Sequence, residues 1–187
     1  MRVLKCQKGY TMIETIGVLA IIAVVGSSAV AFLNKAFLRY KITRLSQQVV
    51  EMQKSIDKRY AAKKTYDNLT VPVLITERLL PADMVYKNGM LYHRLKGTAT
   101  VTLGENNESY TITFNAVPRN ACVELAAQNW GLDQRVILDN IIIGNNKLKW
   151  KCGVGEQNCF AMPLNATQAN QVCAGANNQN NISWTFY

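Results

Sequence analysis

The sequence predicts an α+β protein in which one long N-terminal helix packs on a largely antiparallel sheet and the C-terminal region is closed by disulfides. Three observations lead to this fold class. A helical pattern of apolar residues extends from Tyr10 to Lys64, alternating patterns typical of strands begin at Met90, and four cysteines lie beyond residue 120. With 187 residues, the chain can form one core domain and an additional segment.

Composition and charge exclude two broad classes of protein. Apolar residues make up 49% of the chain and charged residues 18%, which excludes a disordered tail. The net charge of +9 comes from 21 basic and 12 acidic residues. Three of the basic residues precede the apolar block and the others are spread along the chain, so no specific nucleic-acid partner is predicted.

The helix begins with a block long enough to cross a membrane. Residues 15–34 contain no charge, and the run from 10 to 33 contains only Glu14. Twenty-four helical residues reach about 36 Å, which exceeds a hydrocarbon core of about 30 Å. An ordinary signal peptide is the alternative, because Ala29-Val30-Ala31 fits a cleavage site. The mature chain would then be an exported binding domain that starts at Phe32.

An acidic residue near the start of the apolar block argues against the signal peptide. A carboxylate deep in a membrane costs about 2.5 kcal/mol or more. The order of Lys8, Gly9, Tyr10 and Glu14, followed by about twenty apolar residues, resembles the processing site of type IV pilins. The resemblance implies that a prepilin peptidase removes leader residues 1–9 by cutting after Gly9, and that the new N-terminal Tyr10 is N-methylated.

Glu14 also has a physical role that follows from its position. After cleavage, the ammonium of Tyr10 lies four residues before Glu14 on the same helix, where the two can pair. An acid also suits the positive end of the helix dipole. In a bundle of such helices, correct register pairs these charges, whereas a slip leaves one uncompensated in a low dielectric. We therefore expect Glu14 to direct assembly.

The helical pattern continues beyond the apolar block, which defines the domain organisation. Its apolar positions recur at steps of three and four: Ile42, Leu45, Val49, Met52, Ile56 and Tyr60. Two heptads are short for a free coiled coil, which remains an alternative, so we expect this stripe to dock on the chain's own sheet. Residues 10–34 are then a transmembrane and assembly segment, and residues 35–187 are a head domain that includes the docked half of the helix.

The head domain is expected to be mostly strands. Residues 65–87 predict a connecting loop with short helical or extended pieces. A helix is expected to start at Pro118, with Cys122, Leu125 and Ala126 on its apolar face, and to stop at Gly131. Strands are predicted at residues 90–95, 98–103, 109–114, 136–143, 147–152 and 182–186.

Cysteine usage predicts disulfides rather than a metal site. Cys6 lies in the leader, which leaves an even four cysteines in an exported head. Four cysteines allow three pairings. We favour the pairs Cys122–Cys173 and Cys152–Cys159. A zinc site is disfavoured, because the chain has no C-x-x-C and its only histidine, His93, is distant from the cysteines in sequence.

Motifs for catalysis are absent from the sequence. It contains neither G-x-S-x-G nor a phosphate-binding lysine loop. Glu105 and Glu108 flank a predicted turn and are read as solvated side chains. We therefore expect no catalytic residues, no cofactor, no metal and no enzymatic activity.

The whole chain resembles a type IVb pilin of the PilS-like group. The N-terminal motif, the long connecting loop and the Cys122 helix carry this resemblance. It implies a structural subunit of a bacterial pilus that is an inner-membrane precursor and then part of an extracellular fimbrium. The implied partners are further copies of the chain, a prepilin peptidase, and an assembly platform and ATPase. A receptor on a host or bacterial surface is possible, in adhesion, aggregation or conjugation. A minor pilin and a type II secretion pseudopilin are alternatives.

Overall fold

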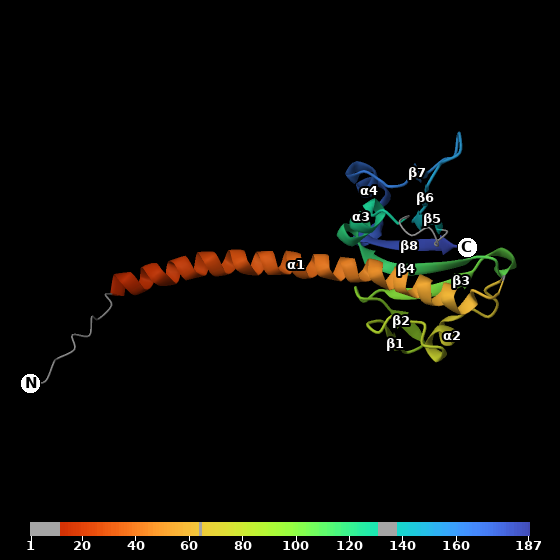
Figure 1. Ribbon diagram of the computed structural model, residues 1–187. Helices are drawn as coiled ribbons and strands as arrows, with labels where there is room; N and C mark the ends of the chain where they lie inside the picture. Colours follow the sequence, from red (N-terminus) through yellow and green to blue (C-terminus); the bar gives the residue numbers. More distant parts are fainter. Residues whose placement is uncertain (1–11, 64, 131–137) are drawn as a thin grey trace, which may run out of the picture. The chain divides into compact units, whose positions relative to one another are not determined.

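A computed structural model describes residues 12–63, 65–130 and 138–187 (Figure 1). The chain divides between Tyr40 and Lys41 into two compact units. The long helix α1, Met12–Tyr60, contributes residues to both units. The first unit is the apolar part of this helix, and the second contains the sheet and the remaining helices, so each is described by itself.

Helix α1 ends earlier than the sequence predicts. The prediction placed its end at Lys64, whereas the helix ends at Tyr60 and Ala61 and Ala62 form a turn. The amide of Lys63 donates to the carbonyl of Tyr60 at 2.8 Å, which closes that turn. The expected start at Tyr10 lies outside the described residues.

The apolar stripe of the second half of α1 is buried, as predicted. All six stripe residues are buried, and the four in the middle are fully buried: Leu45, Val49, Met52 and Ile56. The structure also buries Ser46, Gln48 and Gln53 on the same helix. The buried face is therefore wider than an a/d seam, as expected for a helix that packs on a sheet.

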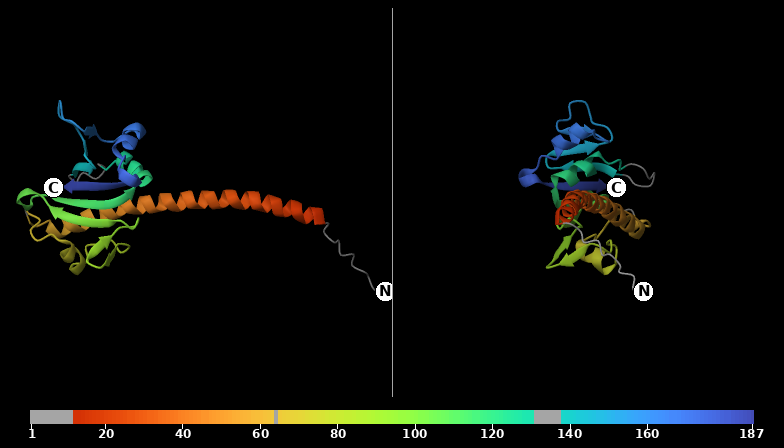
Figure 2. Two further views of the ribbon diagram at one scale, coloured as in Figure 1. Left: turned by 180° about the vertical axis from the view of Figure 1, so that it is seen from behind. Right: turned by 90° about the vertical axis from the view of Figure 1, so that its left-hand side faces the viewer.

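One eight-stranded sheet forms the centre of the second unit, in the order β1-β2-β3-β4-β8-β5-β6-β7. All neighbouring strands are antiparallel except β6 and β7, which are parallel. The α+β class and the largely antiparallel sheet are thus confirmed (Figures 1 and 2). The strands are β1 Val85–Lys87, β2 Met90–Tyr92, β3 Thr98–Leu103, β4 Tyr110–Pro118, β5 Leu138–Ile143, β6 Asn146–Lys149, β7 Cys159–Ala161 and β8 Gln179–Phe186.

Alternation along the central strands forms the core. Tyr110, Ile112 and Phe114 of β4 are fully buried, and their intervening neighbours are partly exposed. Trp184 of the adjacent β8 is also fully buried and meets Phe114 edge-on, with ring centroids 5.4 Å apart. The hydroxyl of Tyr110 reaches Asp57 of α1, so this face of β4 is the one toward the docked helix.

The first half of the sheet differs from the prediction at both ends. The strand expected over 90–95 stops at Tyr92, because His93 begins a turn in which its amide donates to Gly97 at 3.0 Å. A hairpin partner, β1, precedes it through Asn88 and Gly89, both with positive φ. The strand over 98–103 is confirmed as β3. The strand expected over 109–114 continues as β4 to Pro118 through a bulge at Ala116 (φ 57°).

The second half of the sheet contains one strand that was not predicted. Strand β6 ends at Lys149 rather than at residue 152, and β8 starts at Gln179, three residues before the prediction. Strand β7, Cys159–Ala161, was not predicted because three residues give too little periodicity to recognise. Residues 136 and 137 of the strand predicted over 136–143 lie outside the described residues.

The described part of the second unit contains three further α-helices: α2 Val71–Thr76, α3 Arg119–Ala127 and α4 Ala166–Val172. Pro118 is the N-cap of α3, and the helix ends at Ala127 with Gln128 as its C-cap. The predicted stop at Gly131 lies outside the described residues. Helix α4 was not predicted, although Asn165 and Gln168 form a capping box at its start. Two 3-10 turns are η1 Glu105–Asn107 and η2 Ala176–Asn178.

Candidate functional site

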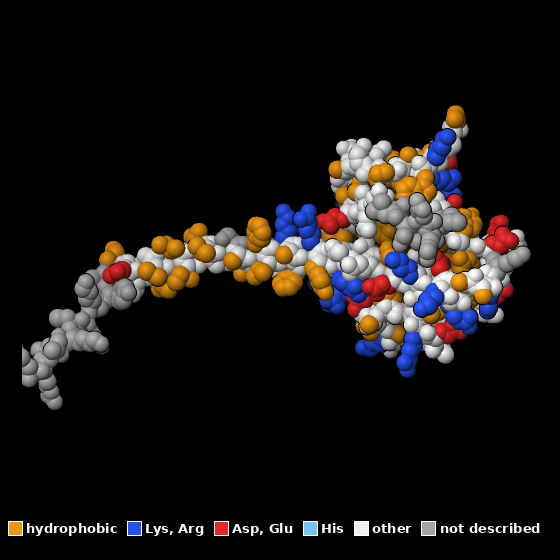
Figure 3. All heavy atoms as spheres, viewed as in Figure 1, with side chains coloured by type: hydrophobic (Ala, Val, Ile, Leu, Met, Phe, Trp, Pro, Cys, Tyr) orange, Lys and Arg blue, Asp and Glu red, His pale blue; other side chains and the backbone are white. Residues whose placement is uncertain are grey.

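The first half of α1 exposes apolar side chains around its surface (Figure 3). Its most apolar stretch of 18 residues has a mean hydropathy of 2.5, and the helix is long and apolar enough to cross a membrane. A helix that is hydrophobic all round needs lipid or other helices as its surroundings. The exposed apolar residues of this half include Met12, Ile13, Ile16, Leu19, Ile21, Ile22, Val24, Val25, Val30, Phe32 and Leu33.

Glu14 lies in the first turn of α1 as described, and its side chain is exposed. A carboxylate at this position interacts favourably with the positive end of the helix dipole. The hydroxyl of Thr15 donates to the carbonyl of Met12 at 2.8 Å, and that of Ser27 donates to Val24 at 2.9 Å. Both hydroxyls are therefore hydrogen-bonded to the helix backbone. Glu14 carries the only charge within residues 12–34.

The predicted processing site lies outside the described residues. Gly9 and Tyr10 both belong to the segment before residue 12, so cleavage after Gly9 and methylation of Tyr10 stay predictions. Among the described residues, no positively charged group pairs with Glu14. Its pairing partner therefore also stays a prediction.

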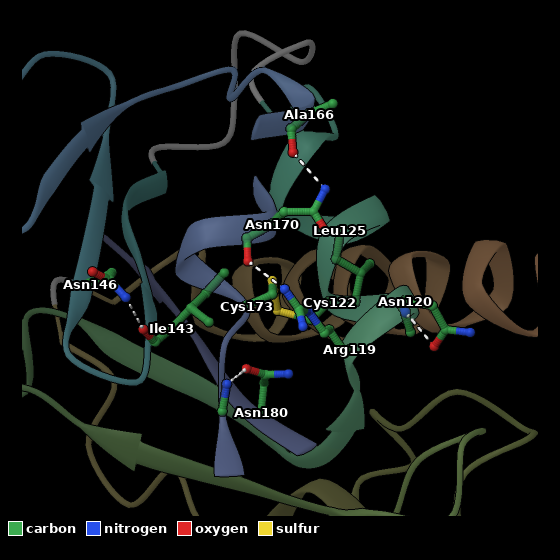
Figure 4. Close-up of a disulfide and its surroundings, with 12 residues drawn as sticks. Arg119, Asn120, Cys122, Leu125, Ile143, Asn146, Ala166, Asn170, Cys173 and Asn180 are labelled. Carbon is green, nitrogen blue, oxygen red and sulfur yellow. Dashed lines mark hydrogen bonds between the residues drawn. A yellow bond between two sulfur atoms is a disulfide. The ribbon is translucent and has the colours of Figure 1, made fainter. Parts of the chain in front are cut away.

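The longer disulfide joins two helices of the head (Figure 4). Cys122 in α3 is bonded to Cys173 at the end of α4, with the two Cα atoms 5.9 Å apart and both residues fully buried. The guanidinium of Arg119 donates to the carbonyl of Asn170 at 3.3 Å across the same pair of helices. This is the pair favoured from the sequence, and it attaches the C-terminal region to α3.

The shorter disulfide closes an eight-residue loop between β6 and β7. Cys152 is bonded to Cys159, with the Cα atoms 5.8 Å apart. The ammonium of Lys149 donates to Glu156 at 2.7 Å within the loop, and this hydrogen bond lowers the pKa of the Glu156 carboxyl. This pairing is also the one favoured from the sequence.

Polar groups tie the docked half of α1 to the rest of the head. Arg44 forms an ion pair with Asp83 at 3.0 Å, and the amide of Arg94 donates to the Gln48 side chain at 3.1 Å. Burial raises the pKa of the Asp83 carboxyl, but the hydrogen bonds from Arg44 and Gln48 outweigh it and lower the pKa overall. Gln48 was not predicted to be buried. It lies three residues after Leu45, so a wider buried stripe would have included it.

His93 is part of the packed core of the head. Its ring stacks on Phe114 with centroids 4.9 Å apart, Nε2 lies 2.9 Å from the Asn115 carbonyl, and Nδ1 accepts from the Leu95 amide. Burial lowers the pKa of His93. Both ring nitrogens are therefore engaged when the ring is neutral, with the proton on Nε2.

Groups that could hold a metal are absent from the described part of the chain. Residues 12–63, 65–130 and 138–187 contain no cluster of three or more His, Cys, Asp or Glu side chains. Glu105 and Glu108 lie at the exposed turn between β3 and β4.

Comparisons with known proteins match both halves of the chain. The family described as PilS N terminal matches residues 39–187, and the prokaryotic N-terminal methylation motif matches residues 4–30. The major structural subunit of bundle-forming pilus from Escherichia coli O127:H6 (strain E2348/69, EPEC) is 23% identical over 185 residues. That alignment covers 96% of this chain and 94% of the relative. The subunit of the same name from Escherichia coli O111:H- has the same identity and coverage.

The fold has a counterpart among solved structures. TcpA, a type IV pilin from the Vibrio cholerae El Tor biotype, superposes with a TM-score of 0.51 at 13% identity. The match covers 78% of this chain and 98% of TcpA. At that identity the likeness establishes the shared fold, and the family match over residues 39–187 supplies the relationship. The chain belongs to the PilS family and is a type IV pilin.

Proposed function

We propose that this chain is the major structural subunit of a type IV pilus. The observation that carries the proposal is the combination, in one chain, of an exposed apolar helix with a disulfide-closed head. A relative aligned over 94% of its length is itself a major pilus subunit. The precursor is an inner-membrane protein, and the mature subunit is part of an extracellular pilus.

The proposed assignment of the chain's parts follows from where charge and apolar surface lie. Residues 1–9 are a leader that a prepilin peptidase removes, and Tyr10 becomes the methylated N-terminus. Residues 10–34 hold the subunit in the membrane and then in the core of the filament. Residues 35–187 form the head, which packs around that core. A platform protein and an ATPase drive the transfer between the two environments.

Glu14 sets the register of the subunits in this proposal. The bare carboxylate is costly among apolar side chains, and that cost is lowest where a neighbour's N-terminal ammonium meets it. Apolar contacts between helices allow many registers, whereas the charge pair allows only one. The exposed position of Glu14 in the first turn leaves its carboxylate accessible to another subunit.

Substitution of Glu14 tests the proposal. In cells that express Glu14→Ala, we expect processed chain to accumulate in the inner membrane while sheared filaments are lost. Glu105→Ala, which removes an exposed acid from the head, is the matched control and should leave filaments normal. Normal filaments from Glu14→Ala would overturn the assembly role. Failure of Glu14→Ala to be processed would instead assign the residue to peptidase recognition.

A role in surface contact is proposed for the amide-rich segment at the start of β8. Asn177 and Gln179 are exposed and uncharged, so they present donors and acceptors without a net charge. Adhesion, aggregation and conjugative contact all require that the pilus bind another surface, and such groups can supply hydrogen bonds for that binding. Asn177→Asp with Gln179→Glu should weaken aggregation without reducing filament number; Asp tolerates the φ of 54° at position 177. Unchanged aggregation would remove this segment from the contact.

A further inference from the structure

A single apolar side chain stands at the tip of the loop between β6 and β7. Val154 is fully exposed and is flanked by Gly153 and Gly155. Figure 3 shows hydrophobic surface at the tip of this loop, which stands clear of the rest of the head. A single exposed valine is common on protein surfaces. A valine held at the end of a closed loop, however, is already positioned for binding, so little conformational entropy is lost when it contacts a partner. We call the segment from Cys152 to Cys159 the Val154 loop.

Several interactions hold the Val154 loop in one conformation. Its two ends are joined by the Cys152–Cys159 disulfide. The Glu156 carboxylate accepts from the amide of Gly153 at 3.1 Å and from Lys149 at 2.7 Å, and the Glu156 amide donates to the Gly153 carbonyl at 3.3 Å. Gly155 has a φ of 80°, the conformation that the third residue of a type II turn requires. A loop fixed in this way loses little entropy on binding.

A pocket of complementary character lies at the start of α3. It has a volume of about 560 Å³. Pro118 and Val123 give it apolar walls, and Glu124 stands exposed on its rim. Figure 4 shows Arg119 on α3 reaching toward Asn170 on α4, so the two helices frame the pocket together. We call it the α3 pocket; its other lining residues are Asn120 and Asn178.

The loop and the pocket lie at opposite ends of the head. At one end of β8, Gln179 pairs with Pro118, which lines the α3 pocket. At the other end, Phe186 pairs with Leu138, whose carbonyl accepts from Trp150 just before the Val154 loop. An eight-residue strand spans about 25 Å. Figures 1 and 2 show α3 near the start of β8 and the loop between β6 and β7 toward its end.

The Val154 loop and the α3 pocket carry side chains of opposite charge that form no ion pair within the subunit. Lys151 is exposed next to the Val154 loop, and Glu124 is exposed on the rim of the α3 pocket. Within the described ranges, neither side chain makes a hydrogen bond or an ion pair. An apolar tip with a free cation therefore has a counterpart in a pocket that combines the apolar Pro118 and Val123 with a free anion. The pocket's own cation, Arg119, already donates to the Asn170 carbonyl.

We infer that the Val154 loop of one subunit inserts into the α3 pocket of the next subunit along the same filament, with Lys151 facing Glu124 across the contact. The inference rests on the proposed function as a pilus subunit. The contact joins two different surfaces at opposite ends of the head, so it is heterologous. Contacts of this type propagate into open chains instead of closing into a dimer, which suits a helical filament.

Photo-crosslinking in intact filaments tests the contact directly. A benzophenone amino acid at position 154 should, in dispersed single filaments, give subunit dimers whose crosslinked peptide contains residues 118–124 or 170–178. The same amino acid at Val85, which is exposed on the edge strand β1, is the matched control and should not reach these segments. Filaments without this crosslink would overturn the inference and leave the proposed function intact, as would crosslinks that form only in bundles.

Charge reversal provides an independent test that does not alter the loop tip. Lys151→Glu and Glu124→Lys should each lower, several-fold, the amount of filament that survives dissociation in detergent. The double reversal should restore it, because the attraction returns with its direction inverted. Losses that add in the double variant would overturn the pairing. Loss of filaments in every variant, the double reversal included, with processing intact, would also contradict it, since the restored charge pair should rescue assembly.

Discussion

The hydroxyl of Tyr110 on β4 donates a 2.8 Å hydrogen bond to the carboxylate of Asp57 on α1. Burial raises the pKa of Asp57, while the hydrogen bonds from Tyr110 and Gln53 oppose that rise. Burial and the nearby Asp57 raise the pKa of Tyr110, so the phenol remains a donor throughout the physiological range. The contact joins the last turns of the docked helix to the middle of the sheet.

Removal of the Tyr110 hydroxyl should destabilise the head. Tyr110→Phe removes the donor to Oδ1 of the half-buried Asp57 carboxylate and leaves only the Gln53 donor on Oδ2, which costs about 1–3 kcal/mol. Tyr86→Phe, on an exposed tyrosine of β1, is the control and should change stability by less than about 0.5 kcal/mol. Urea unfolding of the full chain in detergent, followed by the fluorescence of buried Trp184, measures both. Equal effects of the two substitutions would show that the hydrogen bond contributes nothing.

Asp57 should make stability fall as pH rises. Its pKa in the folded chain is raised above the ordinary value of 3.8, so the folded state holds this proton more tightly than the unfolded state. The contribution is complete below pH 3.8 and is lost as pH rises through the folded-state pKa. The stability of Asp57→Asn relative to the natural chain should therefore increase over this window and then level off. A relative stability that decreases with pH would contradict the assignment.

His93 should have the opposite dependence at higher pH. Burial lowers its pKa below the ordinary 6.5, so its contribution to stability is present above pH 6.5 and is lost as pH falls through the folded-state pKa. We expect the natural chain to lose stability relative to His93→Gln on acidification from pH 7. The two unfolding curves, measured at half-unit steps of pH, provide the comparison. A constant difference between them would mean that the pKa of His93 is the same in the folded and the unfolded chain, which would contradict the effect of burial.

The two disulfides should differ in their contribution to stability. On the chain-entropy account, the Cys122–Cys173 bond, with a sequence separation of 51, contributes about 4 kcal/mol. The Cys152–Cys159 bond, with a separation of 7, contributes about 2.5 kcal/mol. Replacing Cys122 and Cys173 by serines should therefore lower the unfolding free energy more than replacing Cys152 and Cys159. The reverse order would show that native packing, rather than loop closure, determines their effect.

The two halves of α1 should respond differently to the loss of a leucine. Leu45 is fully buried in the head, so Leu45→Ala should lower head stability by about 2–5 kcal/mol. Leu33 is exposed in the apolar half, so Leu33→Ala should leave head unfolding unchanged while reducing the yield of filaments. Unfolding and sheared-filament yield, measured on both variants, separate the two roles. Head destabilisation by Leu33→Ala would contradict this division.

The fold could be predicted from the sequence wherever local pattern and tertiary packing agree. The stripe from Ile42 to Tyr60 is periodic, and the structure buries all of it. Strand β3 alternates cleanly and was predicted with its correct bounds. The end of α1 could not be predicted, because Ala61 to Lys63 are favourable in a helix and only the local turn ends it at Tyr60.

The site was predictable in its chemistry but not in its geometry. The even number of cysteines in an exported head predicts two disulfides but allows three pairings. The structure contains the pairing that was favoured. The α3 pocket could not be predicted, because Pro118 and Asn170 are brought together only by the packing of α3 against α4. Gln48 and Asp57 were also missed, since their burial depends on partners far away in the sequence.

Mass spectrometry of the N-terminal peptide, from filaments sheared off the cell surface, tests the central claim most directly. The account predicts an abundant chain that starts at N-methylated Tyr10, with Glu14 as its fifth residue. A chain that starts at Phe32, or the absence of the chain from the sheared fraction, would contradict its assignment as the major pilus subunit.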